Sequence, residues 1–94
     1  MHSVYILFSV QLDRYYIGQS ENLPLRLEQH NSGYFSGSFT SQVNDWELFH
    51  EIPCESKRQA IQIESHIKRM KSVIYYENLK KHPDISVRLL EKYQ

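Results

Sequence analysis

The sequence contains little of what several common classes of protein require. Its 94 residues include one cysteine, Cys54, so an internal disulfide and a cysteine-rich zinc knuckle are both excluded. No run of about 18 apolar residues occurs, which excludes a membrane-spanning helix. The first residues also lack a basic stretch followed by an apolar signal core. We therefore expect a cytoplasmic protein with no membrane partner.

The chain is short, and 40% of its residues are hydrophobic. A chain of this size buries only about 60 to 65% of its unfolded surface, which is enough for one core between two thin layers. It contains no repeat, no low-complexity tract and no linker. We therefore expect a single domain over residues 1–94.

The formal net charge of zero hides an uneven distribution. Up to residue 55 there are two basic and seven acidic residues, and after it nine basic and four acidic, so the two parts carry about −5 and +5. This distribution is compatible with one surface that faces an anion. Mixed charge on solvated helix faces explains it more simply, so charge alone does not indicate a partner.

Hydrophobic periodicity and capping residues predict an α+β fold. Ser20 or Asn22 caps the first helix, with Pro24 in its first turn and Gly33 at its end, and Ser56 caps a second, long helix. The predicted fold is a small three-stranded antiparallel sheet flanked by helices, in the order β-β-α-β-α-α, followed by a C-terminal helix. The predicted strands are 3–10, 14–19 and 46–52, the helices are 23–31, 57–71, 73–81 and 84–92, and 34–45 is an irregular loop.

Two positions that should face the core in the first helix are polar. The stripe at helical spacing is Leu23, Arg26, Leu27 and His30, so a guanidinium and an imidazole occupy half of it. A half-buried charge is costly unless something pairs with it, and such conflicts often mark functional sites. Alternatively, Arg26 extends to the edge of the core and His30 is a hydrogen-bonded boundary residue.

The long helix carries a carboxylate at its core boundary. Ala60, Ile63, Ile67 and Met70 define the predicted buried stripe, and Glu64 lies beside it. A carboxylate at that position needs a cation, a hydrogen-bond donor or a metal ion. The simplest alternative is an ion pair with a lysine four residues further on, Lys68, which contributes a few tenths of a kcal/mol.

Two tyrosines of the first two strands share a face only if the connection between the strands has an even number of residues. A connection at Gln11 and Leu12 would pair Tyr5 with Gly18 and Tyr16 with Leu7. Gly18 would then leave space for another group to approach the backbone. Tyrosines in strands are usually packing residues, and this remains the alternative.

Together these residues suit a phosphodiester better than other substrates. The sequence shows no pair of carboxylates suited to glycoside hydrolysis, no nucleophile with a visible triad and no glycine-rich nucleotide loop. Arginine binds phosphate through two donors, and a single carboxylate often suffices to hold Mg²⁺. A tyrosine or a histidine could remove the proton of an attacking water, although a phenol needs positive charge nearby to do so.

These residues lie in motifs that resemble those of the GIY-YIG endonucleases, specifically of small free-standing bacterial members. The similarity covers about residues 3–80. Its motifs are Ser3-Val4-Tyr5, Tyr16-Ile17-Gly18, residues 25–33, Trp46-Glu47-Leu48 and residues 63–72.

The resemblance implies a metal-dependent endonuclease that hydrolyses DNA, at structured or damaged sites in repair or recombination. It implies that Tyr5 and Tyr16 shape the site, one as base or positioner of the water, and that Arg26 contacts the scissile phosphate. It further implies that His30 transfers a proton or orients a tyrosine, and that Glu64 holds a single Mg²⁺ or Mn²⁺. Further residues of the implied site are Gly18 and Asn78, with Lys68 and Lys71 near the flanking phosphates.

The sequence departs from the resemblance at the loop after the first helix. Residues 34–47 contain no lysine or arginine, so we expect weak and strongly salt-dependent DNA binding. A separate targeting protein could supply the missing affinity, and the sequence does not indicate an oligomeric state. Two other functions stay open: a non-catalytic module that binds nucleic acid or protein, and a structural protein whose unusual polar residues only pack.

Overall fold

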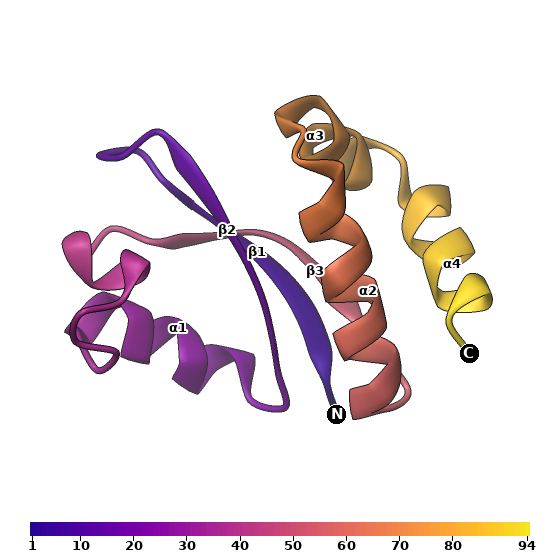
Figure 1. Ribbon diagram of the computed structural model, residues 1–94, viewed down its shortest axis with the longest axis horizontal. Helices are drawn as coiled ribbons and strands as arrows, with labels where there is room; N and C mark the ends of the chain where they lie inside the picture. The colour runs from indigo at the N-terminus through magenta and orange to yellow at the C-terminus, as the bar shows by residue number, and fades with distance from the viewer.

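The computed structural model describes all residues, 1–94. A three-stranded antiparallel sheet has the order β2-β1-β3, and Figure 1 shows α1 on one side of it and α2, α3 and α4 on the other. The α+β class and the predicted element order are confirmed. The strands are β1 (Ser3–Ser9), β2 (Arg14–Ser20) and β3 (Glu47–Pro53), and the helices are α1 (Leu23–Ser32), the 3₁₀-helix η1 (Phe39–Gln42), α2 (Lys57–Met70), α3 (Val73–Lys81) and α4 (Pro83–Lys92). None of the helices is both long and apolar enough to cross a membrane.

The hairpin of β1 and β2 has the register that the sequence predicts. Tyr5 pairs with Gly18 and Leu7 pairs with Tyr16. The connection between the paired positions is four residues, 10–13, rather than two, but it is still even in length, so the pairing is unchanged. The two phenols therefore lie on the same face of the sheet.

The caps of α1 and α2 explain where these helices begin and end. The Asn22 side chain accepts a hydrogen bond from the Leu25 amide, and Gly33 ends α1 in the left-handed conformation, with φ of 77°. The Ser56 hydroxyl accepts from the Gln59 amide, and α2 ends at Lys71, which has φ of 48°. These are the capping positions that the sequence predicts, with Asn22 rather than Ser20 at the first.

Two details of the sequence-based prediction are wrong. Met70 is 44% exposed instead of buried, because it occupies the last position of α2, beyond the part of the helix that the core covers. The segment 34–45 is not wholly irregular, because it contains η1. The Trp46 indole donates to the Thr40 carbonyl at 2.9 Å, which fixes this turn against the sheet.

The sheet separates two cores of unequal size. The larger lies between the sheet and α2–α4 and is built on Val4, Ile6 and Ile17 of the strands. The smaller lies on the α1 side and consists of Tyr5, Leu7, Leu23 and Trp46, with partly buried neighbours. The alternating residues of β1 divide between the two, because successive side chains of a strand point to opposite faces.

Candidate active site

A chain of buried hydrogen bonds crosses the smaller core. The Tyr5 hydroxyl lies 3.0 Å from Nε2 of His30, and Nδ1 of the same ring lies 2.8 Å from the Thr40 hydroxyl. Exposed fractions of 2% for Tyr5, 3% for His30 and 1% for Thr40 mean that these groups have no contact with solvent. A neutral imidazole has one N–H, so the ring donates one of these bonds and accepts the other.

Burial determines the charge states of the Tyr5 phenol and the His30 imidazole. Burial raises the pKa of the Tyr5 phenol well above its ordinary value, and Tyr16 and Glu64 raise it further, while Arg26 acts in the opposite direction. Burial, followed by the positive charge of Arg26, lowers the pKa of His30 to about 4. At neutral pH the phenol therefore keeps its proton and the imidazole is uncharged.

Gly18 makes room for the Tyr5 side chain. A Cβ atom at Gly18 would lie 2.5 Å from the Tyr5 hydroxyl oxygen and 2.6 Å from Cζ, closer than real Cβ atoms come to other heavy atoms. The space that the sequence predicts at Gly18 is present, and the Tyr5 ring occupies it. The phenol can cross β2 because position 18 has no side chain.

Tyr16 differs from Tyr5 in its exposure and its partners. It is half-buried, and its ring packs edge-on against His30 at a centroid distance of 5.1 Å. The Phe39 ring lies nearly parallel to it, at 16° and 6.5 Å. Its hydroxyl makes no hydrogen bond within the protein, so this phenol is the one that can contact water or substrate.

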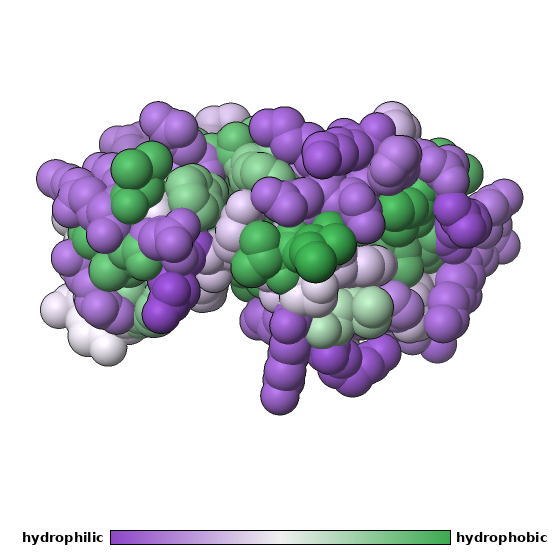
Figure 2. All heavy atoms as spheres, turned by 90° about the horizontal axis from the view of Figure 1, so that it is seen from above, coloured by the Kyte–Doolittle hydropathy of each residue, from purple (hydrophilic) through white to green (hydrophobic).

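Arg26 provides an unpaired positive charge. Its half-buried guanidinium lies 5.4 Å from the centre of the Phe35 ring and has no carboxylate partner. It also lines a hollow of about 440 Å³ beside α1. In the space-filling view, a notch separates the part of the molecule that contains α1 from the part that contains α2–α4 (Figure 2).

Glu64 provides the carboxylate, and its side chain is 19% exposed. One of its oxygens, Oε2, forms an ion pair with Lys68 at 3.2 Å, as the simplest alternative predicted. The other oxygen has no hydrogen-bond partner. No group of three or more His, Cys, Asp or Glu side chains is placed to hold a metal ion together, so a cation at Glu64 would take most of its ligands from water or substrate.

Comparison with known families identifies the family of the chain. The GIY-YIG catalytic domain model matches residues 1–78. The chain belongs to the GIY-YIG family. GIY-YIG domains are generally DNA endonucleases, and GIY-YIG nucleases generally depend on a divalent metal. Searches of curated proteins and of solved structures returned no match.

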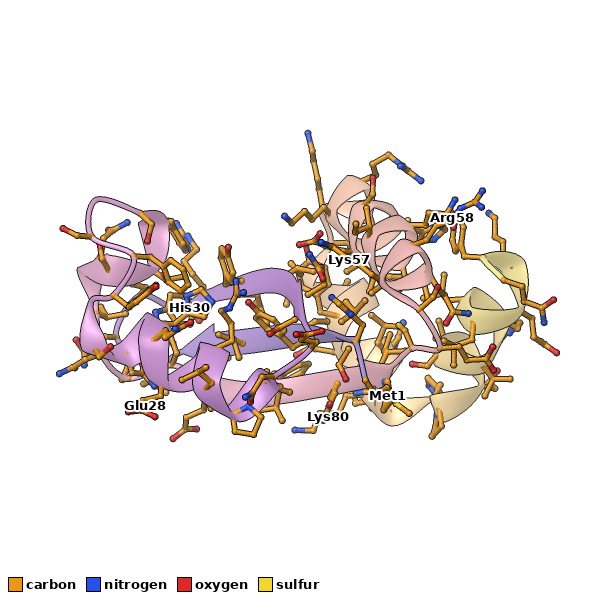
Figure 3. The ribbon with its side chains drawn as sticks, turned by 90° about the horizontal axis from the view of Figure 1, so that it is seen from below. Met1, Glu28, His30, Lys57, Arg58 and Lys80 are labelled. Atoms are coloured by element: carbon orange, nitrogen blue, oxygen red, sulfur yellow. The ribbon has the colours of Figure 1, made fainter.

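Two of the residues expected from the GIY-YIG resemblance, Gly18 and His30, lie against the Tyr5 phenol, and three more act on its pKa. His30 binds it, and Tyr16, Arg26 and Glu64 are all near enough to change its pKa. They come from both sides of the sheet, since α1 carries Arg26 and His30 and α2 carries Glu64. Figure 3 shows His30 within the part that is built by α1 and the following loop.

Three other expected residues lie outside this group. Lys68 is paired with Glu64, whereas Lys71 is exposed where α2 ends. Asn78 is half-buried in α3, its side chain makes no hydrogen bond, and its neighbours Tyr76 and Leu79 belong to the larger core.

The sequence-based reasoning missed Thr40, Phe35 and Lys57. Thr40 holds the His30 ring, Phe35 packs against Arg26, and Lys57 lines the same hollow as Arg26. No periodic pattern could identify the two loop residues, because an irregular backbone path brings them to α1. Lys57 lies two helical turns before Glu64, and that spacing was a signal in the sequence.

Proposed function

We propose that this GIY-YIG domain is a metal-dependent endonuclease that hydrolyses DNA phosphodiester bonds at structured or damaged sites, in repair or recombination. One combination carries the proposal: a chain that matches the GIY-YIG catalytic domain holds a guanidinium with no carboxylate partner and a carboxylate with one oxygen free of hydrogen bonds. A phosphodiester requires both, a cation for its oxygens and a ligand for a divalent metal.

Arg26 is the residue that binds the scissile phosphate. Because no carboxylate neutralises it, the positive charge of its guanidinium is available to phosphate oxygens. Its contact with the Phe35 ring limits the conformations of the side chain before substrate arrives. It opposes the negative charge that grows on the phosphate oxygens in the transition state.

Glu64 fits the requirement for a metal ligand. Its unoccupied oxygen can coordinate one Mg²⁺ or Mn²⁺, which takes its remaining ligands from water and from the substrate phosphate. A bound ion would stabilise negative charge on the departing oxygen. Lys68 holds the carboxylate in place through the second oxygen.

The two tyrosines have different roles in this mechanism. Tyr16 contacts the attacking water and, after losing its own proton to solvent, takes a proton from that water as the water oxygen bonds to phosphorus. The bond to the leaving strand breaks in the same step, and the departing oxygen takes a proton from solvent. It is half-exposed, and its hydroxyl has no other partner. Tyr5 and His30 are positioning residues, because both are buried and bound to each other.

The remaining expected residues act at the margins of the site. Lys68 and Lys71 contact flanking phosphates and Gly18 admits the Tyr5 ring, whereas Asn78 lies in α3 beside the larger core and has no role in the mechanism. With a net charge of zero, the domain depends on a separate targeting protein or on the structure of its DNA for affinity.

The direct test measures nicking of single-stranded, nicked and branched oligonucleotides with Mg²⁺, Mn²⁺ or EDTA. We expect metal-dependent cleavage that falls at least about 100-fold in Glu64→Gln and in Arg26→Ala. Both residues are only half-buried, so both variants should remain folded by circular dichroism. The matched controls are Glu77→Gln and Arg58→Ala, which remove an exposed charge of the same kind elsewhere. Binding without cleavage across the panel would instead make the domain a binding module.

A further inference from the structure

The largest hollow in the molecule extends beyond the residues of the proposed mechanism. We call it the α1–α2 groove, and its principal lining residues are His2, Gln19, Asn22, Arg26, Gln29 and Lys57. Its volume of about 440 Å³ lies within the range of small-ligand sites. Only one of its lining residues, Leu25, is hydrophobic, so the groove suits a polar ligand.

The charge of the groove is positive and unpaired. Arg26 and Lys57 line it against one acidic residue, Glu21, and neither basic side chain takes part in an ion pair. Figure 3 shows Lys57 on the side of α2 that is nearer α1, whereas its neighbour Arg58 lies on the far side. An anionic ligand would therefore find two cations in the groove with no carboxylate partner for either.

Gln19, one of the residues that line the groove, also has a buried polar atom without a partner. The amide oxygen of Gln19 is inaccessible to solvent and accepts no hydrogen bond. Leaving such an atom unsatisfied is costly, so a donor brought by a ligand would stabilise the complex. Gln19 is on β2 and lines the groove with Arg26 and Lys57, so a rotation of its side-chain amide would bring the oxygen to a donor of the bound ligand.

The groove continues the candidate active site. Arg26 belongs to both, and Lys57 precedes Glu64 by seven residues, two turns of α2, so the two side chains emerge from the same face of the helix. Their separation along the axis is about 10 Å at 1.5 Å per residue. A nucleic-acid strand advances by about 3.4 Å per nucleotide, so this distance corresponds to two or three nucleotides.

We infer that the α1–α2 groove binds the substrate strand on one side of the cut, and that Lys57 binds a phosphate two or three nucleotides from the scissile one. The inference rests on the proposed function and adds a substrate-binding position to it. Lys68 and Lys71 lie beyond Glu64 in the other direction along α2, so the strand would follow the helix across Glu64.

The test combines Lys57→Ala with substrates that carry one uncharged methylphosphonate at each position around the cut. We expect Lys57→Ala to weaken binding about fivefold to tenfold, with the single-turnover rate at saturation within twofold of wild type. The slope of log Kd against log salt should fall by about 1. At one position, the methylphosphonate should weaken binding of the wild-type protein by the same factor as Lys57→Ala does. At that position it should cause no further loss of binding in Lys57→Ala.

Two further variants make the test specific. Arg58→Ala, which removes the adjacent charge on the far side of α2, should bind as wild type does. Gln19→Leu should raise the melting temperature, because it removes a buried unpartnered oxygen, and should weaken binding severalfold. A merely structural role for Gln19 would change the melting temperature without changing Kd.

Three results would overturn the inference. The first is a Kd of Lys57→Ala equal to that of wild type. The second is that every methylphosphonate changes the Kd of Lys57→Ala as much as it changes the Kd of wild type. The third is an equal loss of binding in Arg58→Ala. Failure of the proposed function is distinct, because it appears as wild-type protein that binds DNA and never cuts it. In that case the same set of Kd values still decides whether Lys57 binds one particular phosphate. Wild-type protein that neither binds nor cuts would overturn both.

Discussion

Tyr5 and Tyr16 are the same residue type on one face of one hairpin, and their surroundings give them different properties. Tyr5 is enclosed by Gly18 of β2 and His30 of α1, and its pKa is raised mainly because the phenolate would lack water. Tyr16 packs against His30 with its ring and leaves its hydroxyl free. Removal of each hydroxyl should therefore affect different measurable quantities.

For Tyr16→Phe we expect cleavage to fall at least about 100-fold, with the free energy of unfolding within about 0.5 kcal/mol of wild type. For Tyr5→Phe we expect the free energy of unfolding to fall by about 1 to 3 kcal/mol, because a buried nitrogen of His30 loses its partner. Single-turnover cleavage and urea unfolding measure the two effects. Tyr16→Phe that retains full activity would exclude Tyr16 as the base.

His30 makes the stability dependent on pH. Its pKa is about 4 in the folded protein and about 6.5 when unfolded, so between these values the unfolded chain binds more protons. The free energy of unfolding should therefore decrease as the pH falls from about 6.5 to 4, by about 2 to 3 kcal/mol from this group. Urea unfolding at several pH values measures it, and a His30→Gln variant should lack this contribution.

His50 and His66 add to the pH dependence in the same direction, because burial lowers the pKa of each. The His30→Gln variant should therefore retain a smaller dependence, and a double variant with His50→Gln should reduce it further. If wild type and His30→Gln had the same slope, the imidazole would not be the buried neutral group that its surroundings indicate.

The hairpin is the element that sets the geometry of the site, because its even connection brings both phenols to the α1 side. The close contact of Gly18 with Tyr5 makes the pairing testable. In Gly18→Ala the new methyl group would overlap the Tyr5 ring, so the ring must shift and the bond to His30 must lengthen or break. We expect the free energy of unfolding to decrease by about 1 to 3 kcal/mol, and the rate of cleavage to decrease.

Shortening the Tyr5 side chain should remove the conflict. The double variant Gly18→Ala with Tyr5→Leu should therefore be more stable than the two separate losses predict, since each change affects the same contact. The control is Tyr5→Leu alone, which gives the loss of the ring without a new methyl group. Additive losses in the double variant would show that Gly18 matters for the backbone alone.

The elements of this fold were predictable from sequence because local signals determine them. Asn22, Ser56 and Gly33 are capping residues at the positions where the helices begin or end, and the parity of the hairpin follows from the two-residue period of strands. Glu64 was identifiable as a boundary residue from its angle on the helix. The exposure of Met70 was not predictable, because the hydrophobic periodicity of the helix continues past the last turn that the core covers.

The partners of the site residues were less predictable. Thr40 reaches His30 through a turn that the Trp46 indole and the Asn31 side chain hold in place, and no local pattern specifies that path. The sequence also gave no indication that Phe35 would lie against Arg26. Contacts made by an irregular loop depend on the whole backbone, whereas caps and periodicities depend on a few neighbouring residues.

On the scale of the whole molecule, the candidate site joins two parts that are packed independently. Arg26, His30 and both phenols belong to the smaller core and the loop around it, while Glu64 belongs to the helix that covers the larger core. The larger core is also fastened to α4, where the Gln59 amide donates to the Leu90 carbonyl at 2.9 Å. The α1 side has a smaller buried apolar surface to hold it.

This division means that catalytic competence and global folding need not be lost together. If α1 detaches in a partial opening while α2–α4 stay packed, the guanidinium leaves the carboxylate and hydrolysis stops in a molecule that is still mostly native. Amide protons of α1 should then exchange with deuterium faster than those of α2. Heating should abolish cleavage several degrees below the midpoint reported by far-ultraviolet dichroism, and a bound oligonucleotide should bring the two temperatures together.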